Sequence, residues 1–384
     1  MRRFWLSSAA ILIITSAASA QVFSSGNLVV YRVGDGSAAL TNASTAVFLE
    51  QYTVGGTLVG SPIGLPTAGA TAFTAAGNAT SEGFMSLSGD GQFLVLPGYN
   101  VATGLTSVAT STGTAAPRSV GLLDLNASFT LSTLGTSAYS GGNIRSAYST
   151  NGTDIWTSGS NQGVHYHVAG SGTTTGNLMT TPTNTRVTTV INGQLYFTSS
   201  SGAFVGFNSI GTGTPTTTGQ TATNIVGLTS GTGTPSPYGV FALDNPLNPF
   251  AGIDTVYLAD DRAIASGGGV QRWVFDGSSW TLSATANPGT GVRGLTASIS
   301  GSTVTLYGIS AEASANRLVT ISDVLSPTGG TFDPGGFVTL ATAPANTAYR
   351  SVAFAPVPEP GSILAVSAGA LLFGRWVQRR RRKA

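Results

Sequence analysis

The chain has 384 residues, no cysteine and only 8% charged side chains, so neither disulfides nor thiolate metal sites stabilise it. Its formal charge of +2 comes from the two ends: two of the seventeen basic residues stand in the first twenty residues, and six follow from Arg375 onward. Residues 21–374 carry nine arginines against all fifteen carboxylates, a net charge of −6. This mildly acidic body excludes the basic surface of a nucleic-acid-binding protein.

The first twenty residues have the layout of a secretory signal peptide. A positively charged start precedes an apolar run over residues 4–15, and the small residues Ala18–Ala20 follow. An uncleaved anchor or a buried first helix is the alternative, but about 12 apolar residues are too few to span a bilayer comfortably. We expect signal peptidase to cut between Ala20 and Gln21, so that the protein is exported through the inner membrane.

The body, residues 21–356, shows no sustained helical periodicity. Short apolar or alternating runs recur between Gly, Asn, Asp and Pro residues, for example at 27–33, 46–52 and 92–96. Asp90-Gly91 is a hairpin-turn signal between two such runs. We therefore predict one all-β domain over these residues.

An irregular internal repeat organises these strands. Each copy opens near an arginine or another polar residue, continues as a β run, turns at a glycine, and returns as further strands. The clearer copies cover 143–168, 184–207 and 291–320, looser ones open near Glu82 and Asn224, and the last opens at 349–354 but stops after one strand. A period of about 40 residues with up to four strands is typical of β-propeller blades.

We therefore predict a single β-propeller of six blades, or of seven if segment 224–292 contains extra strands. The lone C-terminal strand needs partners, and runs 27–33 and 46–52 supply them. Joining the chain ends in one blade closes the ring and removes exposed strand edges. A β-sandwich or a β-helix is the alternative, because both also contain many short strands.

Four of the nine body arginines, Arg145, Arg186, Arg293 and Arg350, each open a β run at a comparable place in the repeat. In a functional interpretation they ring the channel mouth and bind an anionic sugar or phosphate. In a structural interpretation each bonds carbonyls or an acid in the neighbouring blade. We expect the structural, blade-locking role.

His165 and His167, the only histidines, share one face of a strand and could reach one metal ion. A third ligand such as Asp154, Asp260 or Asp261 would be needed, and we expect instead a polar pair that faces solvent. Asp260-Asp261 could contribute to a calcium site, but no aspartate-rich calcium loop accompanies it. We therefore predict no metal ligands and no cofactor.

The C-terminal segment 357–384 has three parts. Val357-Pro358-Glu359-Pro360 precedes an apolar stretch, 363–373, and a basic cluster ends the chain: Arg375, Arg379, Arg380, Arg381, Arg382 and Lys383. A helix over about 362–378 would be roughly 25 Å long, near the lower limit for a transmembrane span. The basic cluster places this end in the cytoplasm. An ordinary single-pass tail anchor is the alternative.

This layout closely resembles the PEP-CTERM sorting signal of Gram-negative bacteria, with its Pro-Glu-Pro motif, short apolar helix and terminal arginine cluster. The resemblance implies recognition by exosortase, a membrane protease-transpeptidase. It further implies cleavage near the motif and release or transfer to the cell surface, often beside exopolysaccharide. It covers only residues 357–384, so it concerns destination and not the activity of the body.

The body has no signature of nucleophilic catalysis, since it contains no G-x-S-x-G elbow and no phosphate-loop lysine. We predict a non-enzymatic cell-surface or extracellular-matrix protein that is transiently anchored in the inner membrane and binds extracellular polysaccharide. The alternative is a hydrolase or lyase on a propeller scaffold, acting on polysaccharide or phosphate esters with calcium; the fold alone is a weak argument for it.

Overall fold

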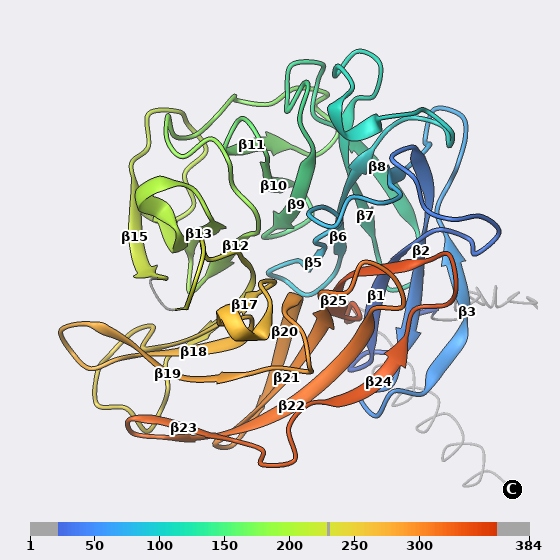
Figure 1. Ribbon diagram of the computed structural model, residues 1–384. Coiled ribbons are helices and arrows are strands. Elements are labelled where there is room, and N and C mark those ends of the chain that lie inside the picture. Colours follow the sequence, from blue (N-terminus) through green and yellow to red (C-terminus); the bar gives the residue numbers. More distant parts are fainter. Residues whose placement is uncertain (1–21, 229–230, 359–384) are drawn as a thin grey trace, which may run out of the picture.

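A computed structural model describes residues 22–228 and 231–358, which form an all-β, propeller-like arrangement of sheets around a common centre (Figure 1). The signal peptide with its predicted cleavage point Ala20/Gln21, the residues Glu359 and Pro360, the predicted helix 362–378 and the basic cluster lie outside the described residues. Within the described part, no helix is long and apolar enough to cross a membrane. The helical elements there are three short 3₁₀ turns: η1 (Val108–Thr110), η2 (Gly202–Phe204) and η3 (Ile264–Ser266).

Four sheets are antiparallel meanders, each a separate blade. The first contains β9 (Ile144–Ser149), β10 (Asp154–Gly159) and β11 (Val164–Val168). The second contains β12 (Thr188–Ile191), β13 (Gln194–Ser199), β14 (Gly206–Ile210) and β15 (Ala222–Gly227). The third contains β16 (Pro237–Leu243), β17 (Thr255–Asp260), β18 (Gly269–Phe275) and β19 (Trp280–Ala286). The fourth contains β20 (Val292–Ser300), β21 (Thr303–Ser310) and β22 (Arg317–Ser326), with β23 (Gly329–Phe332) and β24 (Val338–Thr342) both paired to β22.

The fifth sheet has nine strands and includes both ends of the described chain. Its main path runs β25 (Ala348–Phe354), β1 (Leu28–Val33), β2 (Ser44–Tyr52), β4 (Thr74–Ala76), β6 (Leu94–Tyr99), β7 (Arg118–Leu123) and β8 (Phe129–Thr133). Off this path, β3 (Leu58–Gly64) pairs with β2, and β5 (Ser86–Leu87) pairs with β6.

The predicted joining of the chain ends is confirmed. β25 pairs antiparallel with β1, with Leu28 opposite Phe354, and β1 pairs in turn with β2. Residues more than 300 positions apart in sequence are therefore neighbours in one sheet (Figure 1). This pairing supplies partners to the backbone of the last strand, which would otherwise be an open edge.

Turn chemistry explains two of the hairpins. The Asp90-Gly91 turn joins β5 to β6 as predicted, with Gly91 at φ 76°. Asn192 and Gly193 connect β12 to β13 with φ of 50° and 76°, the left-handed pair that a two-residue hairpin requires. One expected repeat boundary is wrong: Asn224 lies inside β15, and the next blade opens at β16, because the intervening turn residues carry no pattern of their own.

The strands β5, β9, β12, β16, β20 and β25 are the innermost strands of the arrangement. β5 contacts β9 and β25, β9 contacts β12, and β20 contacts β16 and β25. Glycines allow the closest of these approaches. A Cβ on Gly239 of β16 would lie 2.7 Å from the carbonyl oxygen of Arg293 in β20, so only glycine fits there.

The core is divided into layers between neighbouring sheets. One cluster joins Trp156 of β10 to Phe197 of β13, and another joins Tyr257 of β17 to Leu306 of β21. These side chains are at most 2% exposed, and each buried apolar side chain contributes about 1.5–3 kcal/mol to stability. The packed layers therefore hold the inner strands, and the side chains that these present to the centre, in fixed positions.

Candidate functional site: an arginine cluster at the centre

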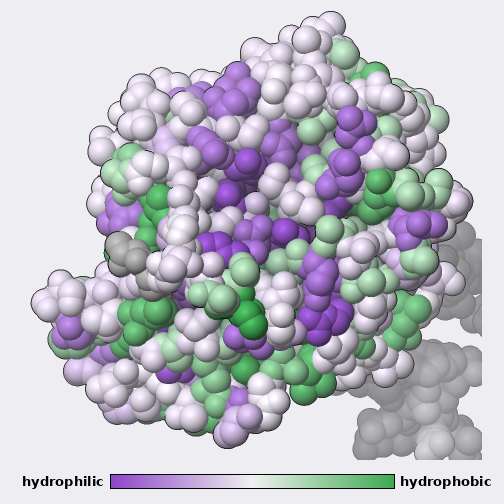
Figure 2. Space-filling model, viewed as in Figure 1, coloured by the Kyte–Doolittle hydropathy of each residue, from purple (hydrophilic) through white to green (hydrophobic). Residues whose placement is uncertain are grey.

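The centre of the arrangement holds four arginines, one from the start of each of four inner strands. We call Arg145, Arg186, Arg293 and Arg350 the central arginines. The face drawn toward the viewer carries η1, η2 and η3, and hydrophilic residues gather over its middle (Figures 1 and 2). Three of them lie in three different sheets, and Arg186 lies two residues before β12 of a fourth, so closure of the ring brings together residues that are far apart in the sequence.

Arg145 and Arg186 form one half of this cluster. Nη1 of Arg145 donates to the carbonyl oxygen of Thr185 at 2.9 Å and to Asn184 Oδ1 at 2.5 Å. Arg186 donates from Nη1 to Ser236 Oγ at 2.9 Å and from Nη2 to a second serine hydroxyl at 2.8 Å. Each guanidinium therefore reaches across to the segment that leads into the next blade.

Arg293 and Arg350 form the other half. Nε of Arg293 lies 2.9 Å from Asp261 Oδ2, at the end of β17 in the preceding blade. Nη2 of Arg350 donates to the carbonyl oxygen of Gly77 at 2.6 Å. Arg293 is thus paired with a carboxylate, whereas Arg350 is 4% exposed and bonded to backbone oxygen.

Three of the central arginines carry an N–H group without an acceptor. The Nε atoms of Arg145, Arg186 and Arg350 are buried and have no hydrogen-bond partner among the described residues. Burial, followed by repulsion from Arg186, lowers the pKa of Arg145 to about 10, and burial with repulsion from Arg293 lowers the pKa of Arg350 to about 10. A desolvated donor without an acceptor costs about 1–3 kcal/mol, and a bound anion would remove that cost.

Two aromatic rings occupy the remaining positions around the centre. Phe84, two residues before β5, and Tyr238 of β16 approach with ring centroids 5.1 Å apart, although they are 154 residues apart in the sequence. Both rings are nearly fully buried, and the guanidinium of Arg186 lies 4.0 Å from the Tyr238 ring centroid. The rings are therefore packed within the cluster and leave no exposed aromatic face for a sugar to stack on.

Glu82 is the carboxylate that lies closest in sequence to this aromatic pair, two residues before Phe84. It is 1% exposed, and Oε2 accepts a hydrogen bond from the Tyr99 hydroxyl at 2.8 Å. Burial raises its pKa to about 7, while hydrogen bonds from Tyr99 and the Ala76 amide, and the charge of Arg350, act in the opposite direction. The site therefore includes one group that titrates near neutral pH.

The histidines do not face solvent, so that expectation is wrong. His165 is 4% exposed and His167 1%, because segment 169–178 covers strand β11, with Asn177 bridged to His165. His165 Nδ1 lies 2.9 Å from the Thr174 hydroxyl. Burial lowers the pKa of both imidazoles to about 4.

The candidate metal ligands are not brought together. No group of three or more His, Cys, Asp or Glu side chains that could hold a metal ion occurs among residues 22–228 and 231–358. Asp260 is bonded to Arg262 and Asp261 to Arg293, while Asp154 accepts from the Tyr166 hydroxyl. These aspartates are therefore already engaged by partners other than the histidines.

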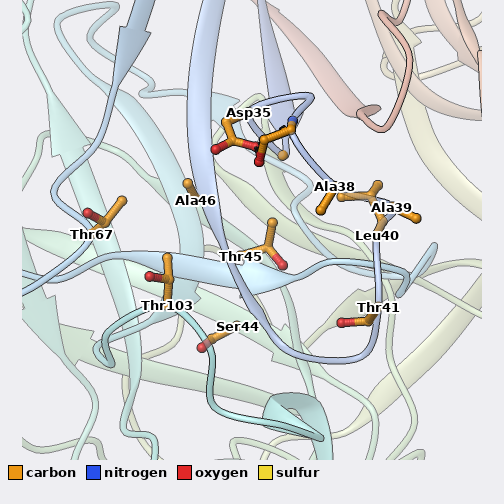
Figure 3. Close-up of a pocket in the computed structure, with 12 residues that line it drawn as sticks. Asp35, Ala38, Ala39, Leu40, Thr41, Ser44, Thr45, Ala46, Thr67 and Thr103 are labelled. Carbon is orange, nitrogen blue, oxygen red and sulfur yellow. Dashed lines mark hydrogen bonds between the residues drawn. The ribbon is translucent and has the colours of Figure 1, made fainter.

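A hollow of about 340 Å³ lies beside the β1–β2 loop (Figure 3). Hydroxyl groups dominate its lining, but Ser44 Oγ accepts from the Leu105 amide and donates to the Ala102 carbonyl. Asp35 in its rim is bonded to the amide and hydroxyl of Ser37. The Ser44 hydroxyl and the Asp35 carboxylate are thus already bonded within the protein, so the arginine cluster is the stronger candidate.

Sequence reasoning named the four arginines as candidates but not Glu82, Phe84 and Tyr238, which lie beside them. Glu82 had marked only the opening of a loose repeat copy. Tyr238 occupies the arginine position in a blade whose opening was placed near Asn224. A correct alignment of that blade would have found Tyr238, but no local signal distinguishes it from an ordinary strand tyrosine.

No protein-family model matches the chain, and no curated protein matches it. Among solved structures, it is similar to "YCF48 bound to D1 peptide" (14% identity, 82% of each chain, TM-score 0.39). It is also similar to the periplasmic gluconolactonase PpgL of Pseudomonas aeruginosa (10% identity, 87% of this chain and all of that one, TM-score 0.42). A third is a protein of unknown function from Bacteroides thetaiotaomicron (12% identity, 85% of each chain, TM-score 0.43). Similarity at this level carries no argument about ligand, activity or partner.

Proposed function

We propose that this chain is an exported, non-enzymatic cell-surface or extracellular-matrix protein that binds acidic polysaccharide at the central arginines. The observation that carries the proposal is the set of buried, unpartnered Nε–H groups on Arg145, Arg186 and Arg350. Carboxylates and phosphates accept from guanidinium groups in a fork geometry, with bonds stronger than those between neutral groups. An anion at the centre would give these donors an acceptor.

The charge distribution supports a specific rather than a diffuse attraction. The body carries more carboxylates than arginines, so a polyanion is repelled by most of its surface. Four arginines converge at one place, and Asp261 neutralises Arg293 alone among them by a direct ion pair. Binding would therefore depend on these few side chains, and each would contribute the roughly 1.5–3 kcal/mol of a hydrogen bond to a charged group.

Delivery to the cell surface is the second part of the proposal. The motif Val357-Pro358-Glu359-Pro360 would direct the chain to exosortase after signal peptidase has removed residues 1–20. The Val357 amide donates to the Gly91 carbonyl oxygen at 2.8 Å, beyond the end of β25. Val357 follows Arg350 by seven residues, roughly 20 Å of extended chain. The central arginines would therefore lie at most this far from the point where the tail leaves the body.

We propose six blades for the ring. The nine-stranded sheet would then count as two blades, β25-β1-β2-β3 and β5-β6-β7-β8, bridged by β4. The innermost strands of these two blades contact each other, as do those of other neighbouring blades. With six blades, Phe84 and Tyr238 come from opposite sides of the ring, which accounts for their meeting at the centre.

A hydrolase or lyase on the same scaffold is the second candidate, and one observation favours it. Glu82 has a pKa of about 7, the value suited to a general acid or base at neutral pH. Both of its carboxylate oxygens already accept hydrogen bonds, from the Ala76 amide and the Tyr99 hydroxyl, which argues against direct contact with a substrate. Depolymerisation of a bound polysaccharide by the wild-type protein, lost in Glu82→Gln, would decide for the enzyme.

The binding proposal is tested by titrating the purified full-length chain with polygalacturonate, with dextran as a neutral polymer and poly-glutamate as an acidic peptide. We expect polygalacturonate to bind, and the double variant Arg145→Gln/Arg186→Gln to lose at least tenfold in affinity. Arg317→Gln, which removes one positive charge from a partly exposed ion pair with Glu312, is the control and should bind like wild type. Equal binding of dextran, tighter binding of poly-glutamate, or equal losses in variant and control would contradict the proposal.

A further inference from the structure

We propose that Glu82 is the counter-ion of the central arginines and that binding of an anion there is coupled to uptake of a proton by this carboxylate. The inference rests on the anion-binding function proposed above and adds its regulation. It starts from the position of Glu82, which is buried and accepts from the Ala76 amide, while Nη2 of Arg350 donates to the carbonyl oxygen of the adjacent Gly77 at 2.6 Å. The carboxylate and this guanidinium are therefore held by neighbouring residues of one turn, although they form no direct ion pair.

The carboxylate is held by hydrogen-bond donors rather than by solvent. The Ala76 amide donates to Oε1 at 2.5 Å, and the Tyr99 hydroxyl donates to Oε2 at 2.8 Å. The Asn143 side chain is a third hydrogen-bond partner. These contacts hold the Glu82 carboxyl group between β4, β6 and the segment that leads into β9.

The charged and titratable groups that face Glu82 come from five strands, one of which is β9 with Arg145. Arg350 lies on β25, Tyr31 on β1 and Tyr99 on β6. Arg118 of β7 is the fifth, with its guanidinium 5.3 Å from the Tyr99 ring centroid. The two tyrosines are buried and their pKa values lie well above 10, so they stay neutral in the physiological range.

Glu82 therefore acts mainly on arginines. Its negative charge opposes the lowering of the pKa that burial imposes on Arg118, Arg145 and Arg350. Two of these three belong to the central arginines. When Glu82 is ionised, its negative charge compensates part of the positive charge that the arginines offer to an anion. When Glu82 is protonated, the full positive charge of the arginines is available to the anion.

The sign of the coupling follows from this geometry. An anion beside Arg350 repels the ionised carboxylate, so the bound state favours protonated Glu82. Burial has already raised the pKa of Glu82 to about 7, which places the exchange of this proton in the neutral range. By linkage, affinity for the anion rises as pH falls through 7, and binding near pH 7 takes up a fraction of a proton.

The experiment is calorimetric titration of the full-length chain with polygalacturonate between pH 5.5 and 8.5, in buffers of different ionisation enthalpy. The polymer is fully ionised throughout this range, so its own charge does not change. For the wild type we expect about tenfold weaker binding at pH 8.5 than at pH 5.5, with net proton uptake at pH 7. In Glu82→Gln, which keeps the size of the side chain but cannot ionise, affinity should equal the low-pH value at every pH.

Two further variants keep the test decisive. Tyr99→Phe removes a donor that stabilises the ionised carboxylate, so the midpoint of the pH profile should move upward, and this outcome can be read even if Glu82→Gln folds poorly. Asp244→Asn removes one carboxylate from an exposed loop and should leave the wild-type profile unchanged. Binding without pH dependence or proton uptake would overturn the coupling alone, whereas absence of binding at every pH would overturn the proposed function as well.

Discussion

The ion pair between Arg272 and Asp323 offers a quantitative test of how neighbouring blades are held together. Arg272 of β18 reaches Asp323 of β22 with an N–O distance of 2.6 Å, and the Tyr257 hydroxyl donates to the same carboxylate at 2.6 Å. The Arg272 side chain is 4% exposed and the Asp323 side chain is fully buried. Replacing Asp323 by Asn would leave a buried guanidinium without its counter-charge.

Breaking a buried pair by removing one partner costs about 3–5 kcal/mol, most of it from the uncompensated charge. We therefore expect Asp323→Asn to lower the free energy of unfolding by this amount. The double variant Arg272→Met/Asp323→Asn removes the uncompensated charge and keeps an acceptor for Tyr257. Its loss in free energy of unfolding should therefore be about 2 kcal/mol smaller than that of Asp323→Asn alone. Urea unfolding followed by tryptophan fluorescence measures both values.

The control is Arg317→Met, because Arg317 and Glu312 form a partly exposed pair with side chains 26% and 31% accessible. Exposed pairs contribute at most about 1 kcal/mol, so this variant should stay close to wild type. The reasoning is refuted if Asp323→Asn costs under 1 kcal/mol, or if the two changes at Arg272 and Asp323 are additive in the double variant.

Three further outcomes are expected. The pKa values of His165 and His167 are about 4 in the folded protein against about 6.5 in the unfolded chain, so the free energy of unfolding is highest above pH 6.5 and falls by about 3 kcal/mol per histidine toward pH 4. Urea unfolding across this range should show that slope, and the slope should become smaller in His165→Gln/His167→Gln. Gly239→Ala places a Cβ 2.7 Å from backbone atoms of β20 and should cost about 1–3 kcal/mol of stability. In the control Gly55→Ala the new Cβ lies 3.8 Å from its nearest neighbour, so this variant should be nearly neutral, and equal thermal midpoints of the two variants would contradict the reasoning. Phe84→Ala empties buried space at the centre and should cost about 3–5 kcal/mol by the same unfolding assay, a prediction that fails if the loss is under 1 kcal/mol.

Much of the fold was predictable because it depends on local chemistry. The runs at 27–33 and 46–52 alternate and end at turn residues, and they are the strands β1 and β2. The single final run at 349–354 could not stand alone, and its pairing with β1 followed from the need to satisfy its backbone. The recurrence of arginine at strand openings was visible for the same reason, since it is a property of each copy.

Two features depended on the assembled ring. The burial of His165 and His167 comes from segment 169–178, which has no regular pattern in the sequence. The opening of the third blade at β16 is set by how β15 ends, not by a recurring residue. In each case the deciding contact joins two segments of the chain, and no short stretch of sequence shows how they lie relative to each other.

The central site shows most clearly which features the sequence determined and which the tertiary structure determined. The sequence by itself determined that four arginines occupy one repeat position and that the body around them is acidic. Only the tertiary structure decided that Phe84 and Tyr238 fill the corresponding positions of two other inner strands, and that Glu82 lies buried behind Arg350. Strand formation depends on neighbours a few residues away, whereas the charge balance at the centre depends on which strands ring closure brings together.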